Sequence, residues 1–191
     1  YDTLFPQVRS SILNDLNDFK IISPSFSISP VDVPFDDRIR IGIRVDSMQA
    51  LDPRIGMYGS NDGKHWNLLG NDRIDGYISA SVRNFSLIAL LADHEKPTLE
   101  IVVPRGDNVV STGLSHIEIM VRDDQSGIVR EEDIAIVLDG KNLIVEYDPE
   151  GQKAFAPLGY LLRRGSHVIE ASVKDAAGNK KNVRSVIMVG S

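Results

Sequence analysis

The feature that most constrains the fold is a strict alternation of apolar and polar residues in several short segments. Residues 38–46, RIRIGIRVD, place isoleucines and a valine at odd positions and arginines at even ones. Residues 116–123, HIEIMVRD, repeat the pattern with the apolar side chains again at odd positions. Because successive side chains of a β-strand point to opposite faces, this period predicts strands with one buried face. The alternation predicts an all-β protein.

Turn signals join these segments into hairpins. Asp139-Gly140 separates two strand-like runs in residues 133–148, and this dipeptide favours a tight hairpin. Residues 167–189 contain two more alternating runs, interrupted by Asp175–Asn179. We predict that this interruption is a turn without a ligand, in which Asp175 accepts hydrogen bonds from backbone N–H groups two or three residues on. Gly178 would supply a positive φ.

Two details of the strand pattern leave alternatives open. Val168 and Val173 differ in parity, which predicts either a β-bulge or a strand buried on both faces. Residues 6–19 carry apolar side chains at spacings of three and four, typical of a helical face: Val8, Ile12, Leu13 and Leu16. The alternative for this segment is an extended lead-in strand.

A domain boundary is indicated where an apolar strand ends at Ala92. The polar tetrapeptide 93–96 follows, and Pro97 then opens a new strand. A short polar insert with a proline between two strands is typical of a domain join. The 191 residues therefore divide into predicted domains at 1–93 and 94–191. Short strands with turn signals at intervals of about 8–12 residues predict a β-sandwich in each.

Composition excludes several classes of function. The net charge is −6 and no basic stripe occurs, which argues against a nucleic-acid partner. No apolar run reaches the roughly 18 residues needed to span a bilayer, so we expect no membrane insertion. The absence of cysteine excludes disulfides, thiolate-bound zinc and cysteine nucleophiles. The chain begins at Tyr1 without a methionine, so we expect a fragment with any catalytic domain upstream.

Catalytic residues are not predicted in this chain. Nucleophilic catalysis needs a serine, threonine or cysteine beside an oriented base, and no sequence motif indicates one. The four histidines, at positions 65, 94, 116 and 167, are scattered and form no His-x-His pair. The glycines of residues 56–63 lie among strands rather than before a helix, so they do not predict a phosphate site.

Calcium is the one cofactor that the acidic loops favour. Calcium prefers several carboxylate and carbonyl oxygens, and candidate ligands cluster in loops. The candidates are Asp93 and Glu95 at the join, Asp123 and Asp124 after a strand, and Asp175 with Asn179. The first four are the predicted ligands. Lys96 among them and the lack of an Asp-x-Asp-x-Asp spacing favour the alternative, in which these acids are solvated turn residues and caps.

Two further features suggest ligand binding, each with a structural alternative. His65 and Trp66 follow a hairpin signal and could present an aromatic platform to a sugar. The alternative places Trp66, the only tryptophan, in the core between two sheets. Arg38, Arg40 and Arg44 form a row on one strand face that could meet an acidic polymer, or else could be solvated or paired with neighbouring acids.

The second half of the chain resembles bacterial immunoglobulin-like modules. The resemblance covers Lys96 to the end and is carried by KPTLEIVVP, IEIMVRDDQSGI, IAIVLDGK and GSHVIEASVKDAAGNKKN. The first half resembles a fibronectin type III-like or immunoglobulin-like module, on RIGMYGSNDGKHWNLLG and FSLIALLADHEKP. Similar regions occur in secreted bacterial multidomain proteins, some with a zinc endopeptidase domain upstream.

The resemblance implies two tandem β-sandwich domains without catalytic residues. It implies a secreted or cell-surface location and a role as an accessory, spacer or adhesion region of a larger exported bacterial protein. The expected partners are neighbouring domains of the same polypeptide and cell-wall or extracellular polysaccharide. The alternative function is a carbohydrate-binding or cell-wall-binding module that uses the Trp66 hairpin. The fold hosts many functions, so it does not choose between them.

Overall fold

The computed structural model describes residues 7–13, 16, 18–29, 34–104 and 109–190. The chain divides into two compact units, Tyr1–Glu95 and Lys96–Ser191, and each is described below by itself. Strands dominate both units, which confirms the all-β prediction. Within the described ranges, helical structure is limited to α1 (Ser47–Leu51) and a 3₁₀ turn, η1 (Glu131–Asp133).

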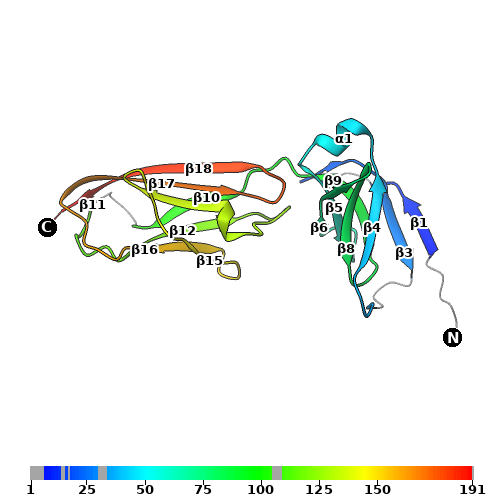
Figure 1. The fold of residues 1–191 in the computed structure, drawn as a ribbon, viewed down its shortest axis with the longest axis horizontal. Helices are drawn as coiled ribbons and strands as arrows, with labels where there is room; N and C mark the ends of the chain where they lie inside the picture. Colours follow the sequence, from blue (N-terminus) through cyan, green and yellow to red (C-terminus); the bar gives the residue numbers. More distant parts are fainter. Residues whose placement is uncertain (1–6, 14–15, 17, 30–33, 105–108, 191) are drawn as a thin grey trace. The chain divides into compact units, whose positions relative to one another are not determined.

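Unit 1 contains two antiparallel sheets (Figure 1). The larger has the strand order β1-β3-β9-β5-β6, with β2 also paired to β9. Its strands are β1 (Gln7–Ser11), β2 (Lys20–Ile21), β3 (Ser25–Ser29), β5 (Ile55–Ser60), β6 (Asn67–Gly70) and β9 (Leu87–Ala92). The smaller sheet has the order β4-β8-β7, from β4 (Ile39–Arg44), β7 (Asp72–Ile74) and β8 (Tyr77–Val82).

The core of unit 1 lies between these sheets. Met57 and Leu90 of the larger sheet and Ile78 of the smaller are fully buried in one cluster, and Ile41 and Ile43 pack against it. Ile41 and Ile43 of β4 therefore face the core, as the alternation predicted, whereas Ile39 at the start of the strand and the even positions are exposed. The two sheets packed face to face give unit 1 the character of a β-sandwich.

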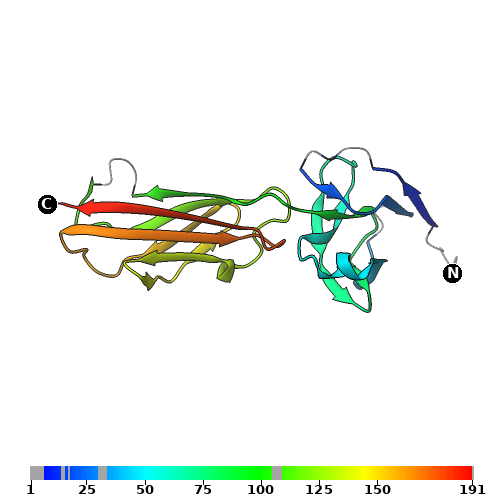
Figure 2. The same ribbon diagram turned by 90° about the horizontal axis from the view of Figure 1, so that it is seen from above.

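Unit 2 also contains two sheets (Figure 2). One has the order β10-β12-β16-β15, from β10 (Thr98–Val103), β12 (His116–Arg122), β15 (Glu146–Asp148) and β16 (Lys153–Pro157). The other has the order β11-β18-β17-β13-β14, from β11 (Val109–Val110), β13 (Ile134–Leu138), β14 (Lys141–Asn142), β17 (Gly165–Lys174) and β18 (Lys180–Val189). The pairing of β11 with β18 is parallel, and the other pairs are antiparallel.

The core of unit 2 is one cluster that both sheets supply. Ile117, Ile119 and Val121 of β12 are fully buried, together with Ile136 of β13 and Ile169 of β17. This confirms the face assignment of residues 116–122. Inner faces that pack in one cluster are the defining feature of a β-sandwich, and so the β-sandwich character of the prediction is confirmed.

The predicted hairpins are present in unit 2. Asp139 and Gly140 have φ values of 49° and 77°, and they join β13 to β14. The β17–β18 ladder runs without a register shift from Gly165, opposite Val189, to Lys174, opposite Lys180. The alternative that predicted a β-bulge in this hairpin is therefore wrong. Val168 and Val173 differ in parity because they lie on opposite faces of β17. Val168 lies on the outer face, whereas the inward-pointing side chains, including Val173, occupy the odd positions.

The helix predicted over residues 6–19 is wrong for its described part. Residues 7–11 form β1, which pairs antiparallel with β3, so the extended alternative holds there. Residues 6, 14, 15 and 17 lie outside the described residues. Tertiary pairing with β3 outweighs the weak helical spacing of this segment. Among the helices that the structure describes, none is long and apolar enough to cross a membrane.

Candidate functional site

The segment Asp175–Asn179 forms the turn between β17 and β18, as predicted. The Asp175 carboxylate accepts a hydrogen bond of 2.7 Å from the Asn179 backbone N–H. The backbone N–H of Asp175 donates to the Asn179 carbonyl oxygen at 3.1 Å, and that of Gly178 donates to the Asp175 carbonyl oxygen at 3.2 Å. Gly178 has a φ of 91°. The side-chain bond of Asp175 thus reaches four residues along the chain, one more than expected.

A second loop, after β12, is tied to this turn. One carboxylate oxygen of Asp123 accepts from the Gly127 backbone N–H at 2.5 Å and lies 3.4 Å from the Ser126 hydroxyl. The Ser126 hydroxyl accepts a hydrogen bond of 3.2 Å from the Ala177 backbone N–H. The last of these bonds connects two loops that are about 50 residues apart in the sequence. Together the bonds fix the positions of two acidic residues at one end of unit 2.

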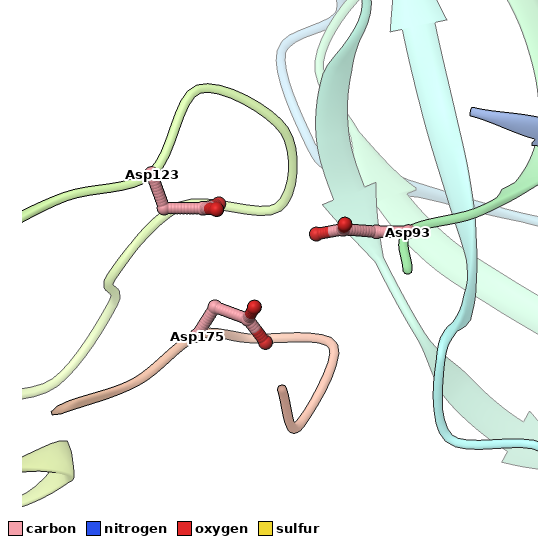
Figure 3. A group of neighbouring side chains, drawn as sticks. All are labelled: Asp93, Asp123 and Asp175. Carbon is pink, nitrogen blue, oxygen red and sulfur yellow. The ribbon is translucent and has the colours of Figure 1, made fainter. Parts of the chain in front are cut away.

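The two acidic residues in these loops are close to one another. Carboxylate oxygens of Asp123 and Asp175 lie within 4.8 Å, and Figure 3 shows the two carboxylates on facing loops. Asp175 is buried and Asp123 is half-buried. Two carboxylates at this separation repel one another, and a bound cation would remove that repulsion. The pair supplies the oxygen ligands that calcium prefers.

The other predicted calcium ligands have different surroundings. The Asp124 carboxylate lies 2.8 Å from Nε of Arg122, and both side chains are exposed. In unit 1, Asp93 follows β9 and is also labelled in Figure 3; its carboxylate accepts a hydrogen bond of 2.9 Å from the Glu95 backbone N–H. Calcium binding by Asp93 and Glu95 stays a prediction. The sequence offered Asp175 as a candidate ligand but favoured a turn without a ligand, because local spacing does not show that two distant loops meet.

The Trp66 ring is not an exposed platform. Trp66 is 4% exposed and packs in a cluster with Tyr58 and Leu91. Its indole N–H donates to the Gly63 carbonyl oxygen at 3.2 Å. Trp66 is therefore buried, as the core alternative predicted, but not between the two sheets: its cluster lies on the opposite face of the larger sheet. A sugar cannot stack on a ring whose faces are covered by protein.

His65 is exposed, but its loop is held by internal hydrogen bonds. Nδ1 of His65 lies 2.6 Å from a carboxylate oxygen of Asp62. The other carboxylate oxygen accepts from the backbone N–H groups of His65 and Lys64, at 2.9 and 2.8 Å. The backbone bond from His65, followed by the bond to its ring, lowers the pKa of Asp62 below its ordinary value. These contacts assign His65 and Asp62 to the turn.

One serine–histidine contact has the residue types of a catalytic triad without its geometry. The Ser115 hydroxyl lies 3.0 Å from Nδ1 of His116, its neighbour in sequence. Nε2 of His116 is 3.9 Å from the Glu118 carboxylate, which is beyond hydrogen-bond distance. Glu118 instead pairs with Lys153 at 3.1 Å. The base is therefore not oriented by the acid as nucleophilic catalysis requires.

The comparisons with known proteins give no family. No model of a known protein family matches the chain, and no curated protein matches it.

Proposed function

We propose that the chain is a non-catalytic accessory region, acting as a spacer or adhesion region of a larger exported bacterial protein. The observation that carries this proposal is the architecture. Each unit is a β-sandwich with its own core, and the polar residues of its loops are hydrogen-bonded mainly within turns. Such a unit provides a stable scaffold and surfaces for binding.

The strand order of unit 2 supports an immunoglobulin-like assignment. Immunoglobulin-type sandwiches place strands A, B, E and D in one sheet and C, F and G in the other. Taking β10 as A, β12 as B, β15 as D and β16 as E reproduces the order A-B-E-D in one sheet. Taking β13, β17 and β18 as C, F and G reproduces the other sheet. These two sheet orders agree with the resemblance found in the sequence.

Unit 1 supports a related assignment with one departure. The small sheet β4-β8-β7 corresponds to B-E-D, and β5 beside β9 corresponds to C beside F. The place beside F belongs to a later strand, G, in the immunoglobulin arrangement. Here β3, which comes early in the chain, pairs with β9 instead. We infer a fibronectin-like or immunoglobulin-like module completed by an N-terminal strand.

Turnover assays test the accessory role. We expect the purified chain to hydrolyse no peptidoglycan, peptide or glycoside substrate, because no oriented nucleophile and base occur among the described residues. Ser115→Ala provides the matched control at the Ser115–His116 contact. The proposal would be overturned if the chain hydrolysed a substrate and a point substitution within the chain abolished that activity. If the wild type and Ser115→Ala were equally active, the activity would have to come from a residue other than Ser115.

A second function, calcium binding, is favoured by the facing carboxylates of Asp123 and Asp175. Both are held by backbone N–H donors, so their positions are fixed before a cation arrives. Together they offer oxygen ligands of the kind that calcium prefers, and water or backbone carbonyls would supply the rest. Calcium bound there would stabilise unit 2 by mass action.

Thermal unfolding with and without calcium tests this second function. We expect millimolar CaCl₂ to raise the melting temperature of the wild type and to leave that of Asp123→Asn/Asp175→Asn unchanged. Asp124→Asn is the matched control, since its carboxylate pairs with Arg122. Asp93→Asn and Glu95→Gln test the remaining predicted ligands. An equal calcium response in the wild type and the double variant would exclude the Asp123–Asp175 site.

A further inference from the structure

The outer face of the three-stranded sheet of unit 1 carries a hollow. Its volume is about 310 Å³, and residues from all three strands line it. The apolar part comes from Ile74 and Tyr77, and the polar part includes Arg40 and Asp75. Ligand pockets in proteins begin at about 300 Å³, so this hollow suits a small unit such as one sugar ring.

The hollow exists because β4 has a glycine at its centre. Gly42 lies between Arg40 and Arg44 on the outer face and pairs with Ser79 of β8. A Cβ atom at Gly42 would lie 3.4 Å from Cβ and 3.5 Å from Cδ1 of Tyr77. The Tyr77 side chain therefore forms one side of the hollow next to Gly42. Tyr77 is 42% exposed, so part of its ring is available to a ligand.

The rim of the hollow offers both hydrogen-bond donors and acceptors. The Arg40 guanidinium lies 3.8 Å from the Asp72 carboxylate, and the two side chains are 55% and 59% exposed. At that distance and exposure the pair is weak, so both groups are available to a ligand. Asp75 is exposed on the hairpin turn between β7 and β8, where Asp75 and Gly76 have φ values of 50° and 80°.

We propose that this hollow binds a neutral sugar ring of an extracellular or cell-wall polysaccharide. Sugar hydroxyls both donate and accept hydrogen bonds, which matches a rim containing a guanidinium and carboxylates. The apolar C–H face of a pyranose matches the exposed part of the Tyr77 ring. Asp72 and Asp75 offset the positive charges of Arg40 and Arg44 on this face, which favours a neutral ligand over an acidic one.

This carbohydrate site lies at Tyr77 and not at Trp66, which is buried. The choice of ligand class rests on the accessory role proposed above, while the location rests on the geometry of the sheet. The two can fail separately. Turnover by the chain would overturn the accessory role without affecting the hollow. Loss of the hollow as a binding site would leave a scaffold role intact.

Titration with three soluble tetrasaccharides tests the proposal. The probes are β-1,4-linked glucose, β-1,4-linked N-acetylglucosamine and α-1,4-linked galacturonate, added to the full chain and followed by backbone NMR shifts. We expect at least one neutral probe to bind with a Kd of about 0.1–1 mM, as is reasonable for a shallow, small site. The shifted amides should lie in β4, β7 and β8.

Gly42→Ala is the decisive variant. Its new methyl group would occupy the hollow, and its contacts of 3.4–3.6 Å are ordinary van der Waals distances, so the sheet should fold normally. We expect it to weaken binding at least tenfold without lowering the melting temperature. Arg40→Gln should weaken binding several-fold. Gly113→Ala and Arg184→Gln are matched controls from unit 2; Arg184 lies 3.8 Å from Glu170, like the Arg40 pair.

Three results would overturn the proposal. The first is that neither neutral tetrasaccharide binds. The second is that binding survives Gly42→Ala unchanged. The third is that only the galacturonate probe binds, which would assign this face to an acidic polymer held by the arginine row.

Discussion

At the scale of single residues, Gly178 shows where backbone conformation alone selects an amino acid. Its φ of 91° lies in the left-handed region, and a Cβ atom there would have no atom within 4 Å. Gly178→Ala should therefore cost about 1–3 kcal/mol through backbone strain and nothing through collision. Gly159→Ala is the matched control, since that position is equally open but its φ lies outside the left-handed region. Equal melting temperatures for the two variants would contradict this.

His167 links the stability of unit 2 to pH. Its ring nitrogens lie 2.6 Å from the Asp139 carboxylate and 2.8 Å from the Arg163 carbonyl oxygen. The bond to the Arg163 carbonyl, followed by that to Asp139, raises the pKa of His167 above 6.5. Because the folded state holds the proton more tightly, the stabilisation is complete below pH 6.5. It is lost as the pH rises through the raised pKa.

Denaturant unfolding across this pH range tests the linkage. The difference in unfolding free energy between the wild type and His167→Gln should be largest below pH 6.5 and should shrink as the pH rises. Asp139→Asn should reduce the same pH dependence, because it removes the charged partner. A difference that stays constant from pH 5 to pH 9 would show that His167 contributes only through packing.

At the scale of secondary-structure elements, Arg73 connects β7 to the segment around α1 through hydrogen bonds. Its guanidinium donates to the carbonyl oxygens of Ala50, Asp52 and Ile55 at 3.0, 2.6 and 2.9 Å, and also to that of Asn71. Arg73→Lys should cost about 1–3 kcal/mol, because a single ammonium group cannot reproduce the planar fork. Arg83→Lys, another substitution in unit 1, serves as control. Unfolding free energies that fall equally in both variants would contradict the role of Arg73.

The sequence predicted elements best where the signal was local. Ile117, Ile119 and Val121 alternate with polar residues, and Asp139-Gly140 can hardly form anything but a tight turn, so strand and hairpin followed directly. Where an element depends on pairing with a distant segment, the local sequence did not predict it. Residues 7–11 form a strand because β3 supplies a pairing edge, which a helical spacing in one segment cannot reveal.

The same limit applies to the candidate sites. A single tryptophan in a β-sandwich favoured a buried Trp66, but only its packing against Tyr58 and Leu91 distinguishes this from an exposed sugar platform. Asp123 and Asp175 were both candidate ligands, but the sequence could not show that they lie together, because 52 positions separate them. The hollow at Gly42 was hidden for a similar reason, since its walls come from three strands.

At the scale of the whole molecule, the two units have separate cores. The core cluster around Ile119 contains only residues of unit 2, and those around Met57, Tyr58 and Ile88 contain only residues of unit 1. We therefore expect two unfolding transitions in calorimetry. Ile119→Ala should cost about 2–5 kcal/mol and lower one transition by about 8 °C or more, leaving the other in place.

Met120→Ala is the matched control for this substitution, because its side chain lies on the opposite face of β12 and is 42% exposed. It should shift neither transition by more than about 2 °C, since exposed substitutions change stability little. A single transition that moves as a whole in Ile119→Ala would show that the units unfold cooperatively.

The long β17–β18 hairpin determines how unit 2 would respond to tension. Thr98, at the start of β10, lies opposite Arg122, and the adjacent Asp123 lies beside Asp175 in the turn that closes the hairpin. Val189, at the end of β18, lies at the far end of a ten-residue strand, about 30 Å away. A pull on the chain would therefore draw β18 lengthwise past β17 and β11. The force would then act along the strands and would be shared by all the hydrogen bonds between β18 and its neighbours. Unit 2 would unfold only when many of these hydrogen bonds broke at the same time.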